Sequence, residues 1–352
     1  MSELFGPMFA RGKAAETVTD RAWLQAMLEA EVALAAAAAS WQAVPSDSAE
    51  AIRKAADPER FDIGEVARST ARIGNPVGGV VDRLRELVGP EHAAAVHHRA
   101  TSQDILDTAM MLVARDAVTT VAEDLAACER ASIDLHHRAG ETRMIGRTLL
   151  QQAVPVRSAA LFAQWRNALQ LARDQLEGLE YFASYSGPVG SVGNDGLDPR
   201  VMLAFAQTLE LTPSFDWHTV RSPVVRIAAA AAESAGTCGK IAVDIILLSQ
   251  NEIGEVGEAR GGGSTSMPHK HNPVAATAAR ACATRTPGLV STLYAAMPQE
   301  LQRSPGLWHS EWEALTDLLR LTGSAAAWLR ESLEGLRIHP EAMQRNLEGG
   351  PA

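Results

Sequence analysis

The chain has 352 residues, of which 46% are hydrophobic and 21% charged, and its formal net charge is −10. These values are typical of a globular protein that is long enough for a large buried core. An acidic chain argues against a nucleic-acid partner, because phosphate binding draws on clustered Lys and Arg. No uncharged apolar run of membrane-spanning length occurs, and the start of the chain does not resemble a signal peptide. We therefore expect a cytoplasmic protein with no membrane partner.

The cysteines argue against a disulfide-stabilised protein and against a zinc protein. Cys128, Cys238 and Cys282 are scattered and odd in number. Without Cys-x-x-Cys or His-Glu-x-x-His spacing, they indicate buried thiols in a reducing compartment and not disulfides or a zinc site. We expect neither a metal nor a cofactor.

The first part of the chain predicts several short helices. Thr19 suits the N-cap of a helix that reaches Trp41 and stops before Pro45. Three shorter helices are expected near 47–56, 62–72 and 77–88. We take residues 1–100 as an N-terminal helical domain.

Beyond residue 100 the chain predicts much longer helices. Residues 104–138 contain neither Pro nor Gly and repeat apolar residues at helical spacing, which predicts a helix on the order of 50 Å long. Four more long helices are expected at 155–184, 223–253, 273–296 and 306–336, and no region shows strand alternation. Such helices are stable when packed lengthwise. The sequence thus predicts an all-α protein with a long-helix bundle over 101–335 and a short tail over 336–352. Broad Ala-rich faces also favour a homo-oligomer.

A glycine-rich stretch, 260–273, separates the third and fourth long helices. Gly261, Gly262 and Gly263 exclude a stable helix there, whereas Pro273 suits the first turn of the next one. The same stretch carries polar side chains, namely Ser264, Thr265, Ser266, His269, Lys270 and Asn272. A polar glycine loop that enters a helix N-terminus predicts an anion site.

Polar residues gather in the other joints between long helices as well. They include His97, Thr101, Ser102 and Gln103 before the first long helix, Thr148 and Gln151 after it, a Gly-rich turn at 185–196, and Arg303 and His309 before the fifth. Helix capping alone can account for Thr101 or Ser102 and for Asp104. For each single residue a surface-loop role stays open. Together, the joints favour a site gathered from several helices, within one subunit or between subunits.

Three of these segments resemble a known family. Gly263-Ser-Thr-Ser-Met-Pro-His-Lys-His-Asn-Pro273 resembles the signature loop of the fumarase/aspartase superfamily, Gly-Ser-Ser-x-Met-Pro-x-Lys-x-Asn-Pro. His97-x-x-x-Thr-Ser-Gln-Asp104 and Arg147-Thr-x-x-Gln-x-Ala-x-Pro155 are similar to two further regions of that family, so the resemblance covers nearly the whole chain. Within it, segments 101–108 and 302–312 look most like the 3-carboxy-cis,cis-muconate cycloisomerases.

The resemblance implies a fold, an assembly and a site. It implies a homotetramer with a helix bundle shared by the subunits, and active sites assembled from three of them. It also implies a small tricarboxylate substrate and a signature-loop serine that moves a proton at the carbon next to a carboxylate. Residue matching favours Ser264, with Ser266 left open because Thr265 stands where the family usually has Ser. The implied substrate-binding residues are His97, Thr101, Ser102, Gln103, Thr148, Gln151, Met267, Lys270, Asn272 and Arg303.

One departure from the family pattern distinguishes among the reactions that members of the superfamily catalyse. The elimination lyases have a His directly after the Thr of the second region, where this chain has Leu149. That His handles the proton of a poor leaving group. A substrate carboxylate that closes a lactone ring is already ionised at neutral pH. Leu149 therefore favours conversion of 3-carboxy-cis,cis-muconate to 4-carboxymuconolactone, a step of protocatechuate breakdown.

Three further functions stay open. An elimination lyase for a succinyl-type substrate, a cycloisomerase for a sulfonated muconate and a non-catalytic helical scaffold all fit the superfamily. Arg99 stands where the family usually has Gly, and adds either a carboxylate contact or a surface charge. Many relatives also continue beyond Asn346 into a further small helical domain, which we expect this chain to lack.

Overall fold

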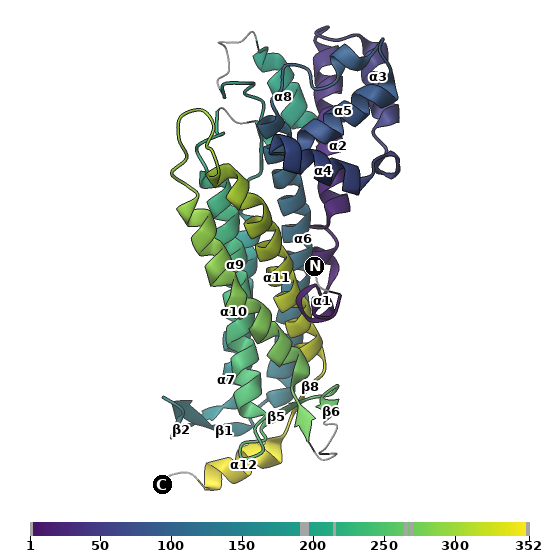
Figure 1. The fold of residues 1–352 in the computed structure, drawn as a ribbon. Helices are drawn as coiled ribbons and strands as arrows, with labels where there is room; N and C mark the ends of the chain where they lie inside the picture. Colours follow the sequence, from purple (N-terminus) through teal and green to yellow (C-terminus); the bar gives the residue numbers. More distant parts are fainter. Residues whose placement is uncertain (1–2, 191–196, 214–215, 264–266, 268–269, 350–352) are drawn as a thin grey trace.

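The structure is a computed structural model that describes residues 3–190, 197–213, 216–263, 267 and 270–349. Long helices lie side by side in an elongated bundle (Figure 1). They are α6 (Ser102–Ala139), α7 (Ser158–Glu177), α9 (Ser222–Leu248), α10 (Val274–Ala295) and α11 (Leu307–Glu334). Successive long helices run in opposite directions, so their connections fall at the two ends of the bundle.

Lengthwise packing holds the bundle together. α10 packs against α9 and α11, and α6 packs against α7 and α11. α6 has 38 residues and is therefore roughly 57 Å long. Its first half is buried on every side, as Met110, Met111 and Leu112 show. Helices of this length draw their stability from such packing. The predicted architecture of long, lengthwise-packed helices is confirmed.

Smaller helices cover one end of the bundle, which we call the cap end (Figure 1). They are α2 (Asp20–Ser40), α3 (Ser46–Ala55), α4 (Ile63–Ile73), α5 (Val77–Val88) and α8 (Pro199–Thr208). The Thr19 hydroxyl accepts the N–H of Ala22 at 3.2 Å, which confirms its N-cap role. By length and composition α2 could cross a membrane, but 61% of its most apolar window is buried, as in a core helix.

The opposite end, which we call the hairpin end, carries short strands and a terminal helix (Figure 1). They are β1 (Arg143–Thr148) with β2 (Gln151–Arg157), β5 (Val256–Glu258) with β8 (Leu336–Ile338), β6 (Gly262–Gly263) with β7 (His271–Asn272), and α12 (Pro340–Glu348). Each of these strand pairs is antiparallel. One further pair, β3 (Phe182–Ala183) with β4 (Thr212–Pro213), is parallel.

The β1–β2 hairpin corrects two predictions from the sequence, the absence of strands and a helix over 155–184. Leu149 and Leu150 form its turn with φ values of 50° and 62°. Two-residue turns of this left-handed kind favour Asn and Gly, so the residue types gave no hairpin signal. Pro155 lies inside β2 and does not open a helix; α7 begins at Ser158 and ends before Gly178.

Candidate active site

The predicted site residues divide between the two ends of the bundle. The cap end holds His97, Thr101, Ser102, Gln103 and Arg303, and the hairpin end holds Thr148, Gln151, Met267, Lys270 and Asn272 (Figure 1). Because α6 spans roughly 57 Å between them, one chain does not bring the two sets together. Ser264 and Ser266 lie outside the described residues, so the proton-transfer role remains a prediction.

At the cap end, the joint before α6 touches the joint before α11. Thr101 is the N-cap of α6, and the Asp104 carboxylate accepts its backbone N–H at 2.9 Å in a capping box. Nη2 of Arg303 donates to the Thr101 hydroxyl at 2.6 Å and to the Pro188 carbonyl at 3.4 Å. Ser102, half-buried, is the first residue of α6. The structure thus brings Thr101, Ser102 and Arg303 into one region.

Asp104 has a second role that the sequence did not reveal. Its fully buried carboxylate accepts hydrogen bonds from the Ser184 hydroxyl and from the backbone N–H groups of Ser186 and Gly187, and lies 2.8 Å from Nε2 of His218. Burial opposes its ionisation, but the contact with His218 and the backbone donors hold the pKa of Asp104 below its usual range. An Asp in a capping box already has a local explanation, so nothing in the pattern indicated these distant contacts.

Gln103 lies in the protein interior. Its side chain is fully buried. Its amide donates to the Asp107 carboxylate at 3.1 Å and to the His218 carbonyl at 2.8 Å. In the single chain the Gln103 side chain stabilises the packing of α6 against the segment before α9, and its substrate contact stays a prediction.

Next to Gln103 lies a buried charge cluster that joins three long helices. Arg221, fully buried, pairs with Asp107 at 2.8 Å and with Glu311 at 2.6 Å. Trp308 donates its indole N–H to Asp107, and Gln299 donates to Glu311, each at 3.0 Å. Burial raises the pKa of Glu311 to about 7, although Arg221 counteracts part of that rise. The cluster fixes the cap ends of α6, α9 and α11 relative to each other.

At the hairpin end, Arg147 anchors the hairpin to the body of the protein. Its guanidinium donates to both carboxylate oxygens of the fully buried Glu255, at 2.9 and 3.0 Å. The Asn346 amide in α12 donates to the same carboxylate at 2.8 Å. Thr148 and Gln151 pair across the turn at the free tip, and both are exposed. The structure therefore presents these two predicted site residues at the tip of a hairpin that Arg147 anchors.

β6 and β7 flank the signature loop and pair with each other. The Lys270 N–H donates to the Met267 carbonyl at 3.0 Å. Met267 and Lys270 are exposed, and Asn272 is half-buried in β7, just before α10 begins. The described part of the loop therefore places Lys270 and Asn272 at the start of α10, as the sequence predicted.

The N-terminus of α10 does not offer the anion site that we expected. The backbone N–H groups of Ala275 and Ala276 donate to the carboxylate of Glu258 at 3.1 and 2.8 Å. The Ser332 hydroxyl donates to the same carboxylate at 2.6 Å. The protein's own Glu258 thus satisfies this helix end. A substrate carboxylate here would be bound by loop side chains and not by the first turn of α10.

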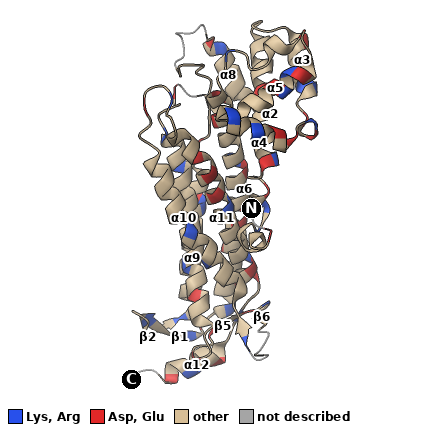
Figure 2. Cartoon of the chain, viewed as in Figure 1, with Lys and Arg blue, Asp and Glu red and all other residues tan. Residues whose placement is uncertain are grey.

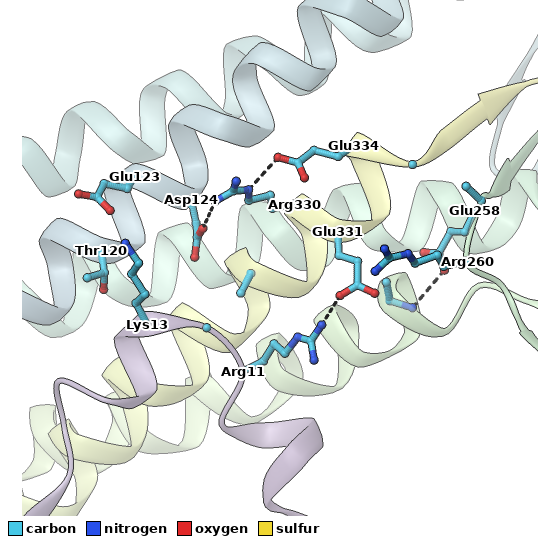
Figure 3. A pocket seen from close by; sticks show the side chains of 15 residues that line it. Arg11, Lys13, Thr120, Glu123, Asp124, Glu258, Arg260, Arg330, Glu331 and Glu334 are labelled. Carbon is cyan, nitrogen blue, oxygen red and sulfur yellow. Dashed lines mark hydrogen bonds and ion pairs between the residues drawn. The ribbon is translucent and has the colours of Figure 1, made fainter.

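A charged cavity of about 530 Å³ opens between α6, α11 and the N-terminal segment (Figure 3). Arg11 pairs with Glu331 at 2.5 Å, and Arg330 pairs with Asp124 at 3.2 Å and with Glu334 at 2.8 Å. None of the predicted site residues lines this cavity. Its charges largely neutralise each other, so we assign it no part in the site.

Comparison with known proteins gives the family. A family model described as lyase matches residues 9–288. The chain is 40% identical to a nitrosuccinate lyase of Streptomyces davaonensis, over 99% of this chain and 77% of that protein. It is 39% identical to a 3-carboxy-cis,cis-muconate cycloisomerase of Pseudomonas putida, over 99% of this chain and 85% of that protein. The crystal structure of the Pseudomonas putida 3-carboxy-cis,cis-muconate lactonizing enzyme matches with a TM-score of 0.93 at 39% identity, covering 99% of this chain and 80% of that one.

The chain therefore belongs to the fumarase/aspartase family of lyases, and is an enzyme of that superfamily. The predicted membership of this superfamily is confirmed. The relatives include a nitrosuccinate lyase and a 3-carboxy-cis,cis-muconate cycloisomerase, so family membership by itself does not identify the substrate.

Proposed function

We propose that the protein is a cycloisomerase that converts 3-carboxy-cis,cis-muconate to 4-carboxymuconolactone. The observation that carries this proposal is Leu149, which stands where elimination lyases of the family have a His. Leu149 forms the hairpin turn directly after Thr148, and its side chain is 96% exposed in the single chain. A hydrocarbon there cannot give a proton to a departing amine or alcohol. Ring closure by a substrate carboxylate does not need that proton.

The proposed chemistry is an intramolecular addition. One substrate carboxylate attacks the conjugated double bond and forms the C–O bond of the lactone. The alkene electron pair moves onto a neighbouring carboxylate as an aci-carboxylate, whose charge Lys270 and Asn272 stabilise; one preorganised donor contributes roughly 3 kcal/mol. Ser264 gives a proton to the adjacent carbon and regains one from water, so the reaction consumes one proton overall.

The reaction needs residues from both ends of the bundle, so we propose that different subunits of a homotetramer supply them. Apolar side chains at the hairpin turn support this, since Leu150 is 70% exposed beside an apolar groove of about 670 Å³. Among the 22 residues of α10 only Arg280 and Arg285 are charged, and Figure 2 shows α10 as a mostly uncharged helix. Burial of such faces against copies of the chain is favourable.

Elimination from nitrosuccinate is the second candidate. It is favoured by the 40% identity to a nitrosuccinate lyase. Nitrite leaves as a stable anion and needs little help from a general acid, so Leu149 argues only against lyases that release an amine or alcohol. Between the two candidates, the resemblance of segments 101–108 and 302–312 to the cycloisomerases favours the first. Lys270 and Asn272 would again stabilise charge on a substrate carboxylate, and the serine would act as the base instead of the acid.

One assay separates the two candidates. The purified protein is given 3-carboxy-cis,cis-muconate, with loss of ultraviolet absorbance as the signal, and separately nitrosuccinate, with nitrite as the signal. We expect turnover of the muconate. Nitrite release without muconate turnover would establish the second candidate instead.

The serine is tested with a matched pair of variants. We expect Ser264→Ala to lower kcat by about 10²- to 10⁴-fold, since proton transfer by a positioned group contributes that much. Ser266→Ala should leave most of the activity. Undiminished turnover by Ser264→Ala would contradict the assignment of Ser264 as the proton donor. Loss of activity in Ser266→Ala alone would assign that role to Ser266.

A further inference from the structure

At the cap end the buried carboxylate of Glu31 contacts His97. The proposed chemistry gives Glu31 no role. Glu31, in α2, is 1% exposed. Its Oε1 lies 2.6 Å from Nδ1 of His97, and its Oε2 accepts the backbone N–H of His97 at 3.0 Å. The His97 backbone has φ 61°, a left-handed conformation that is uncommon outside glycine. One carboxylate therefore fixes both the ring and the strained backbone of His97.

This clamp determines which edge of the imidazole is free. Because Nδ1 contacts Glu31, Nε2 lies on the opposite edge of the ring. Nε2 has no hydrogen-bond partner in the part of the chain that the structure describes, and the His97 side chain keeps 14% of its surface exposed. Four residues further along the chain is Thr101, which Arg303 contacts. His97 therefore lies in the same joint before α6 as Thr101, which is a second predicted substrate-binding residue.

The charges around His97 favour its cationic form. Burial opposes protonation, but Glu31 from α2 and Asp104 from α6 outweigh both burial and Arg85 from α5, so the pKa of His97 lies above its ordinary value. An ionised Glu31 retains the proton on Nδ1. The proton that leaves on titration is therefore the one on Nε2.

We propose that Glu31 is a positioning residue, which holds His97 so that its Nε2–H donates a hydrogen bond to a carboxylate of the bound substrate. This inference rests on the proposed function only in requiring a polycarboxylate substrate. The Glu31–His97 pair is neutral overall when both groups are charged, so the cation costs little in the interior. A donor of this kind makes a charge-assisted hydrogen bond to a carboxylate. At high pH the Nε2 lone pair would face the substrate carboxylate, and affinity would fall.

The kinetic test uses the pH dependence of KM. In the wild-type protein we expect KM to rise as pH passes the His97 pKa. Glu31→Gln keeps the side-chain size but removes the charge, so KM at pH 6 should increase about tenfold. The alkaline rise should begin at lower pH, and kcat should change less than threefold. Glu31→Asp keeps the charge and should restore the pH midpoint.

The matched control is Glu29→Gln, at an exposed position of the same helix, which should change neither KM nor its pH midpoint. Two results would overturn the inference. If Glu31→Gln only lowers the unfolding temperature, with KM and its midpoint unmoved, Glu31 is merely structural. If kcat falls and KM does not change, His97 does not bind the substrate carboxylate.

A second measurement does not depend on turnover. Diethyl pyrocarbonate modifies unprotonated imidazole, so its rate at His97, followed by peptide mass spectrometry against pH, reports the His97 titration. The midpoint should lie at lower pH in Glu31→Gln than in the wild-type protein, and an unchanged midpoint overturns the pairing. If the wild-type protein converts neither 3-carboxy-cis,cis-muconate nor nitrosuccinate, the proposed function fails, whereas this titration still decides the role of Glu31.

Discussion

The two ends of the bundle are built in different ways. At the cap end, charged groups such as Asp104, Arg221 and Glu311 are buried and satisfied within one chain. At the hairpin end, Leu149 and Leu150 project into solvent from a two-stranded arm. The cap half of the site is thus preorganised by a single chain, whereas the hairpin half displays apolar surface that a second copy can cover. The difference indicates that the cap end is completed by folding of one chain, whereas the hairpin end is completed by association of chains.

The largest effect on activity should come from substitutions that inactivate the cap end in one chain and the hairpin end in another. Arg303→Ala at the cap end and Lys270→Ala at the hairpin end should each lower activity by about 100-fold, because each removes a cation that we propose to stabilise a substrate carboxylate. Co-expression of the two variants should restore about one quarter of wild-type activity, since random mixing leaves both halves intact at that share of shared sites. Co-expressed protein as inactive as its parents would contradict the proposal that subunits share each active site.

The next effect concerns folding at the cap end. Asp107→Asn leaves Arg221 with one charged partner in the interior, and should lower the free energy of unfolding by about 3–5 kcal/mol. Urea denaturation followed by circular dichroism measures this. Asp116→Asn, an exposed position of the same helix, should cost less than about 0.5 kcal/mol. Equal effects of the two substitutions would contradict the buried cluster's role in stability.

At the hairpin end we expect assembly, not folding, to respond. Leu150→Asp places a charge on a side chain that is 70% exposed in one chain. The single chain should keep its helical content, with a change in stability within about 0.5 kcal/mol, while light scattering should show dissociation of the oligomer. Leu203→Asp in α8, 54% exposed at the cap end, is the control and should leave assembly intact. An unchanged oligomer in Leu150→Asp would remove the hairpin from the interface.

The smallest effect is a pH dependence at Glu311. Its pKa is raised from 4.5 to about 7, so the folded protein holds a proton that the unfolded chain has lost between those values. The free energy of unfolding should therefore fall as pH rises from 4.5 through about 7. In Glu311→Gln the decrease in the free energy of unfolding between about pH 5 and 7.5 should be smaller by on the order of 1 kcal/mol. Parallel pH profiles for the two proteins would show that Glu311 is not the titrating group.

Residues of the site differ in how well sequence patterns could find them. Lys270 and Asn272 belong to a dense local motif, and the structure places both at the start of α10 as predicted. Gln103 belongs to an equally dense motif, yet it is buried against Asp107. A motif specifies residue types along the chain, and it does not tell which side of a helix N-terminus faces the interior.

Sequence patterns alone were enough to predict the long helices and the family. Apolar spacing without Gly or Pro over 104–138 led to α6, and the signature loop led to the fumarase/aspartase family. The folded chain was needed to show that the left-handed pair Leu149 and Leu150 turns a hairpin, and that the site residues lie at opposite ends of α6. It was also needed to place Glu31 against His97, 66 positions away. Local propensity is carried by neighbouring residues, but such contacts depend on how whole helices pack, which no local pattern encodes.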